Sequence, residues 1–167
     1  MSLKPEKLAI RRIRQQDHAD LKNLYSESIE VQDSGLYSIK QIQAWSSKAW
    51  LPNVFSTVFE EGSGWLSFED QEFAAFACRY PLDRLALLYT RNKYSRRGHA
   101  TRLLRQIEFD ALNDGQKRLV TEASLISHPL LLKLGWQVIR REQIMIAGIG
   151  FERFRMQKLL SPPKPRP

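Results

Sequence analysis

Cysteine is almost missing from this chain. Cys78 stands alone among 167 residues, so no disulfide can form within the chain. It lies in the apolar run FAAFACRY, which predicts a small buried hydrophobic side chain. No stretch approaches the roughly eighteen consecutive apolar residues of a membrane-spanning helix. The opening MSLKPEKLAI lacks the long apolar core of a secretory signal, so we expect a soluble, cytoplasmic protein with no membrane partner.

Several ligand-binding patterns are also absent. No group of His, Cys and Asp has metal-ligand spacing, so we predict no metal. Neither the dinucleotide motif G-x-G-x-x-G nor the phosphate loop G-x-x-x-x-G-K-[ST] occurs. The composition, 43% hydrophobic and 26% charged, is that of a globular protein. We expect one domain over residues 1–160, followed by a flexible, basic, proline-rich tail over residues 161–167.

Acidic residues are missing from one long segment. The net charge is +8, and no Asp or Glu occurs between Arg84 and Ile107. The basic residues of that segment are Arg84, Arg91, Lys93, Arg96, Arg97, Arg102 and Arg105. An anionic cofactor, an acidic substrate or nucleic acid would each account for such an excess.

Hydrophobic periodicity predicts an α/β fold with a mixed, mostly antiparallel sheet and helices on both faces. We expect a strand over residues 7–13, a helix capped by Asp17, a second helix over 38–45 and a short one behind Pro52. Two strands joined at residues 69–71 and a third over 83–90 come next. A helix with Leu103, Leu104 and Ile107 on one face leads to a strand over 117–123. A short helix in HPLLLKLGW and strands near 137–146 and 151–158 complete the order.

The stretch YSRRGHATRLL, residues 94–104, has the features of a phosphate site. It joins a predicted strand to an amphipathic helix, and the N-terminus of a helix has unpaired N–H groups that attract anions. Gly98 lets the backbone approach a ligand, and Arg96 and Arg97 add forked donors. The alternative is an ordinary turn glycine beside solvated arginines.

This context resembles the acyl-CoA loop of the GNAT superfamily of N-acetyltransferases, whose pattern is matched by Ser95-Arg96-Arg97-Gly98-His99-Ala100. A second block, EASLISHPLLLKLGW, is similar to the later strand, short helix and Gly-aromatic pair of that family. The resemblance implies an acyl-CoA cleft at splayed central strands and acetyl-CoA as co-substrate. It also implies a pantetheine arm along Leu88, Tyr89 and Thr90, and a pyrophosphate facing Arg96, Arg97, Gly98, His99, Ala100 and Thr101.

Three positions depart from the family pattern. Ser95 replaces Gln or Arg, and His99 replaces an aliphatic residue. Leu131 occupies the position where relatives often place a tyrosine that protonates the departing thiolate. Because most phosphate contacts in such a loop come from backbone N–H groups, we expect the first two changes to reshape cofactor binding without abolishing it.

Several residues are candidates for the chemistry and the acceptor pocket. Glu122 could accept a proton through water or form an ion pair with a nearby arginine. Ser124 could bind the cofactor arm or cap a turn, and thiolate protonation would fall to water, Tyr89 or Ser124. Tyr37, Trp45 and Trp50 could line the acceptor pocket or belong to the core.

The sequence therefore favours an N-acetyltransferase that acts on a small amine or a peptide. A CoA-binding sensor with little catalysis is the first alternative, since the tyrosine is missing. A nucleic-acid binder is disfavoured because no helix-turn-helix or RNA-recognition pattern accompanies the basic run. The closing strands leave room for a homodimer.

Overall fold

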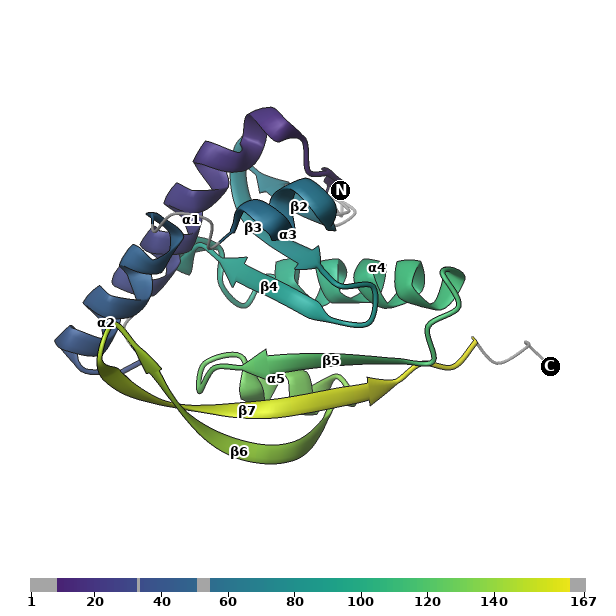
Figure 1. Cartoon of the computed structure of the whole chain (residues 1–167). Helices are drawn as coiled ribbons and strands as arrows, with labels where there is room; N and C mark the ends of the chain where they lie inside the picture. Colours follow the sequence, from purple (N-terminus) through teal and green to yellow (C-terminus); the bar gives the residue numbers. More distant parts are fainter. Residues whose placement is uncertain (1–8, 33, 51–54, 163–167) are drawn as a thin grey trace, which may run out of the picture.

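The structure, a computed structural model, describes residues 9–32, 34–50 and 55–162, although not the side chain of Trp50. Two antiparallel sheets form its framework (Figure 1). The first has the order β1–β2–β3–β4, from β1 (Ile10–Arg12), β2 (Ser63–Glu69), β3 (Glu72–Arg79) and β4 (Leu85–Thr90). The second has the order β5–β7–β6, from β5 (Arg118–Ala123), β6 (Gln137–Ile146) and β7 (Ile149–Leu159).

Helices cover both faces of the first sheet, as predicted. α1 (His18–Glu30), α2 (Ile39–Ser46) and α3 (Ser56–Glu61) lie on one side, whereas α4 (His99–Asn113) lies on the other (Figure 1). α5 (His128–Lys133) follows β5, with Pro129 in its first turn and Gly135 at a φ of +92° after its end. No described helix has the length and apolar character needed to cross a membrane.

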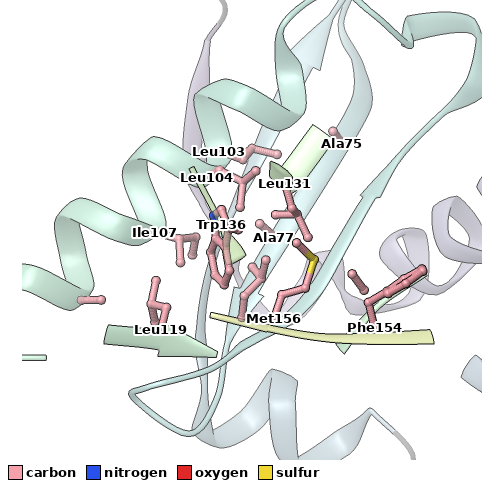
Figure 2. Packing of buried hydrophobic residues seen from close by; sticks show 13 residues of the cluster. Ala75, Ala77, Leu103, Leu104, Ile107, Leu119, Leu131, Trp136, Phe154 and Met156 are labelled. Atoms are coloured by element: carbon pink, nitrogen blue, oxygen red, sulfur yellow. The ribbon is translucent and has the colours of Figure 1, made fainter. Parts of the chain in front are cut away.

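Two apolar clusters explain how alternation along β3 positions these helices. Ala75 and Ala77 face α4, where they pack with Leu103, Leu104 and Ile107 around Trp136 (Figure 2). Phe76 and Cys78 alternate with these alanines and face α1. Cys78 is buried, which raises the pKa of its thiol, and this agrees with the hydrophobic role expected from the sequence.

Two details at the N-terminal end differ from the predictions. The first strand spans only Ile10–Arg12, because Ala9 and Ile13 are not part of it and residues 7 and 8 lie outside the described part. Asp17 precedes α1, but its side chain does not cap that helix. Its carboxylate instead accepts hydrogen bonds from Arg11 and from the backbone N–H of Arg14, so it fixes the turn before the helix. Pro52 and residues 163–167 of the predicted tail also lie outside the described residues.

Candidate active site

The two sheets meet at a narrow junction between β4 and β5. Val120 donates its backbone N–H to the carbonyl of Asp83 at 2.9 Å, beside a single parallel bridge between Arg84 and Val120. The hydroxyl of Thr121 donates to the carbonyl of Leu85 at 2.8 Å. Beyond these contacts the two strands run in the same direction and diverge (Figure 1), and no other described strand pairs with this edge of β4.

A β-bulge sets the direction of the backbone groups in β4. Cys78 pairs with Leu87 but Arg79 pairs with Leu85, so Ala86 is an extra residue on β4. Past the bulge, the N–H of Arg91 donates to Ala74 at 2.8 Å. In an antiparallel strand the backbone N–H groups of alternate residues point toward the paired strand. The N–H of Tyr89 therefore points to β3, like that of Arg91, and the N–H of Leu88 points to the open edge. The splayed strands expected from the sequence thus expose a backbone donor.

A cleft lies at this divergence. Its lining includes Arg84 and residues 85–89 of β4, with Glu122, Ser124 and Leu131 on the opposite side. The cleft therefore brings together Leu88, Tyr89, Glu122 and Ser124, which are distant in the sequence. Leu131, which takes the place of the usual tyrosine, also belongs to the apolar cluster under α4.

The loop before α4 has the geometry of an anion site. Gly98 is the N-cap residue with a φ of +90°, and Arg96 has a φ of +60°. No side chain caps the helix, and the first intrahelical hydrogen bond runs from Arg102 to the carbonyl of Gly98 at 2.9 Å. The N–H groups of His99, Ala100 and Thr101 consequently have no partner within the helix, which is the arrangement that binds phosphate oxygens.

The side chain of His99 is buried, so only its backbone N–H is placed to face a pyrophosphate. Its Nδ1 forms a short hydrogen bond with the hydroxyl of Ser67, and its Nε2 contacts Glu69 at 2.7 Å. Arg97 pairs with the same Glu69 carboxylate, and these hydrogen bonds lower the pKa of Glu69. Although serine, histidine and glutamate are aligned, Ser67 is 0% exposed, so no substrate can reach it. The network ties the start of α4 to β2 instead.

Replacing Ser67 by alanine should lower the free energy of unfolding by about 1–3 kcal/mol, because Nδ1 of the buried His99 would lose its partner. Chemical denaturation measures this change. Ser95→Ala is the control, since Ser95 is exposed and its hydroxyl donates to the nearby carbonyl of Asn92. Its effect should stay within about 0.5 kcal/mol. Equal effects of the two substitutions would contradict a structural role for the buried pair.

The two arginines of the loop differ in their surroundings. Arg97 is engaged by Glu69 and lies over the ring of Tyr94, with 5.8 Å between its guanidinium carbon and the ring centroid. Arg96 is exposed and has no ion pair with any described residue. Arg96 is therefore the more available of the two for a phosphate.

Glu122 and Ser124 adopt the structural alternatives that the sequence left open. Two nitrogens of Arg84 donate to one Glu122 oxygen at 2.8 and 2.9 Å, and Arg155 lies 3.8 Å from the other oxygen. Ser124 and Ser127 bond reciprocally through their hydroxyls and backbone N–H groups, which closes the turn before α5.

Two of the aromatic candidates, Tyr37 and Trp45, line the cleft and form a connected group with Tyr89. The ring centroids of Tyr37 and Trp45 are 5.1 Å apart, and those of Trp45 and Tyr89 are 6.4 Å apart. The hydroxyl of Tyr37 accepts the backbone N–H of Leu125 at 2.9 Å, so a residue from before α2 reaches the β5–α5 turn. Burial raises the pKa of Tyr89 to about 12 and also raises the pKa of Tyr37.

Sequence reasoning missed two cationic residues of the cleft, Lys48 and Arg153. Lys48 lies in the 3-10 turn Ser47–Trp50 and Arg153 in β7, and both are far along the chain from the basic segment at residues 84–107. Alternation along β7 was the available signal for Arg153. Nothing in the local pattern around Lys48 predicts its position.

The family model for an acetyltransferase (GNAT) domain matches residues 33–160. The chain belongs to this family. The GNAT resemblance and the fold expected from the sequence are thus confirmed. The comparison with curated proteins gave no significant match.

Solved structures of the GNAT fold align over nearly the whole chain. A GCN5-related N-acetyltransferase from Rhodopseudomonas palustris has a TM-score of 0.87 at 24% identity, covering 96% of this chain and 100% of its own. PaiA N-acetyltransferase from Thermoplasma acidophilum, in complex with coenzyme A, has a TM-score of 0.71 at 18% identity, with coverages of 92% and 99%. YncA from Salmonella typhimurium, with acetyl-CoA, has a TM-score of 0.63 at 15% identity, with coverages of 97% and 99%.

Proposed function

We propose that this GNAT protein transfers the acetyl group of acetyl-CoA to a primary amine by direct attack of the amine on the thioester. The observation that carries the proposal is the open edge of β4. There the N–H of Leu88 faces a cleft, and the same strand leads to the unpaired amides at the start of α4. The structures of PaiA with coenzyme A and of YncA with acetyl-CoA, which share the fold, support the choice of cofactor.

Each part of the cofactor has a matching feature in the chain. The N–H groups of residues 99–101, with Gly98 and Arg96, suit the pyrophosphate. The edge of β4 from Leu88 to Thr90 suits the pantetheine amides, which can add to the sheet as a strand would. The N–H of Leu88 can donate to the thioester oxygen, where negative charge develops during attack. Tyr37 and Trp45 then border the side from which the amine enters.

The proton transfers need little help from acidic or basic side chains. The amine forms a C–N bond as the C–S bond breaks, and the proton it loses passes to water. Tyr89, with a pKa of about 12, stays protonated at neutral pH and can donate a hydrogen bond in the cleft. Proton transfer from Tyr89 to a thiolate whose thiol has a pKa of about 8.5 is unfavourable, so the thiolate takes its proton from water.

We expect Glu122→Gln to lower kcat less than about tenfold and to leave the shape of the pH–rate profile unchanged, because Glu122 positions Arg84 rather than accepting the proton. Acetylation rates measured across pH test this. A general base would behave differently. Its removal costs about 100- to 10,000-fold and removes the limb that reports its ionisation, and that outcome would reassign the base to Glu122.

Isothermal titration with acetyl-CoA, with CoA and NADH as comparisons, tests the cofactor, and thiol release in a screen of amines tests the transfer. Micromolar binding of acetyl-CoA with turnover of an amine supports the proposal. Binding without turnover of any amine would favour the second function, a CoA-binding sensor, which draws support from the engaged Glu122 and Ser124 and from Leu131. No binding at millimolar ligand would contradict both.

A further inference from the structure

One side chain of the acceptor cleft carries a charge that the described protein does not balance. Lys48 is half-buried, lines the cleft and has no ion pair with any described carboxylate. Burial lowers the pKa of its ammonium, and the nearby Arg153 and Arg84 lower it further, while Glu122 opposes them. A half-buried ammonium next to two guanidinium groups is stabilised by an incoming anion.

The carboxylates around Lys48 are already engaged by arginines. Glu122 pairs with Arg84, and Glu152 pairs with Arg141 at 2.6 Å. The neighbouring Glu142 accepts hydrogen bonds from three arginines, Arg140, Arg153 and Arg155. The cations that line the cleft, Lys48, Arg84 and Arg153, therefore outnumber its carboxylates, Glu122 and Glu152. The basic loop before α4 is not part of this lining. A polyamine would meet repulsion here, whereas an oxyanion would complete the charge balance.

The remainder of the cleft suits an apolar or aromatic body. Tyr37, Trp45 and Phe151 form a continuous group, with 6.2 Å between the ring centroids of Tyr37 and Phe151. Gln41 in α2 donates to the carbonyl of Gly150 at 3.0 Å, which holds α2 against the β6–β7 hairpin beside this group. Aromatic walls with a few placed polar groups are typical of small-molecule pockets.

We propose that the amine acceptor carries an oxyanion, a carboxylate or a phosphonate, which Lys48 binds together with Arg84 and Arg153. The acceptor class is then an amino acid, a short peptide with a free carboxylate, or an aminophosphonate. This inference rests on the proposed acetyl transfer for its kinetic readout, but it concerns a binding site that equilibrium measurements can test separately.

The kinetic test compares four matched amines: phenylalanine, its amide, phenylethylamine and the aminophosphonate analogue of phenylalanine. We expect kcat/KM to be about 10- to 100-fold higher for the two anionic amines than for the amide and phenylethylamine. Lys48→Gln should remove most of that preference, and Lys48→Arg should keep it. Lys40→Gln is the control, because Lys40 is exposed on α2 and outside the cleft lining. The higher kcat/KM of the two anionic amines shows whether the site prefers a carboxylate or a phosphonate.

The binding test uses the CoA-loaded protein without turnover. N-acetyl-phenylalanine should bind about tenfold tighter than its amide, and Lys48→Gln should equalise the two. Equal affinities in the unaltered protein, or a preference that survives Lys48→Gln in a variant with an unchanged melting temperature, overturn the inference. If no amine is acetylated but the carboxylate preference in binding persists, the proposed transfer fails while the anion site stands.

Discussion

Replacing Gly98 by valine should raise the dissociation constant for acetyl-CoA roughly 100-fold or more, through the loss of two or more hydrogen bonds to a charged phosphate. Gly98 has a φ of +90° at the N-cap of α4, a conformation that a β-branched residue rarely adopts. Valine would move the N–H groups of the first turn and place methyl groups where the phosphate approaches. Isothermal titration of the purified variant measures the loss.

Gly115→Val provides the control for backbone strain. Gly115 has a φ of +83° just beyond the other end of α4, and a Cβ atom added there would meet nothing within 4 Å. Both substitutions should therefore destabilise the fold by a similar amount, about 1–3 kcal/mol. Only the change at Gly98 should weaken binding. Wild-type affinity in the Gly98 variant would move the pyrophosphate away from this loop.

Trp136→Ala should lower the free energy of unfolding by about 3–5 kcal/mol, because it empties the centre of the cluster between α4, α5 and the second sheet. Trp136 is 2% exposed and packs with Leu104, Ile107 and Leu131 (Figure 2). Chemical denaturation of the variant gives the change directly. The loss is large for a protein whose total stability is expected to be about 5–15 kcal/mol.

Trp136→Phe separates packing from hydrogen bonding. The indole Nε1 is buried and has no hydrogen-bond partner in the described part of the protein, so phenylalanine removes volume but no hydrogen bond. We expect a smaller loss of stability than for alanine. If phenylalanine were as damaging as alanine, an unseen partner of the indole N–H would have to explain it.

Most elements of this fold follow from local sequence signals. The apolar spacing of Leu103, Leu104 and Ile107 predicts α4, and Pro129 and Gly135 mark the limits of α5. Such signals act within a few residues along the chain, which explains why they can be recognised without the fold. The prediction that Asp17 caps α1 was wrong, because its carboxylate pairs with Arg11, six residues away.

The candidate site divides in the same way. The uncapped helix start at Gly98 was predictable because a strand end, a glycine and a helix start are consecutive. The direction of His99 was not, because Ser67 and Glu69 on β2 determine it. Likewise, Glu122 could have been a base or a partner of an arginine until the fold placed Arg84 across the β4–β5 junction.

The sequence by itself determined the family, the order of elements and the glycine turn at the start of α4, since each depends on residues close together in the chain. Only the tertiary structure decided which N–H group of β4 points to the open edge and which charges share the cleft between β4 and β5. Lys48 comes from the 3-10 turn Ser47–Trp50, Arg84 from the turn before β4 and Arg153 from β7. Their electrostatic interaction depends on distance in space, which no local pattern encodes.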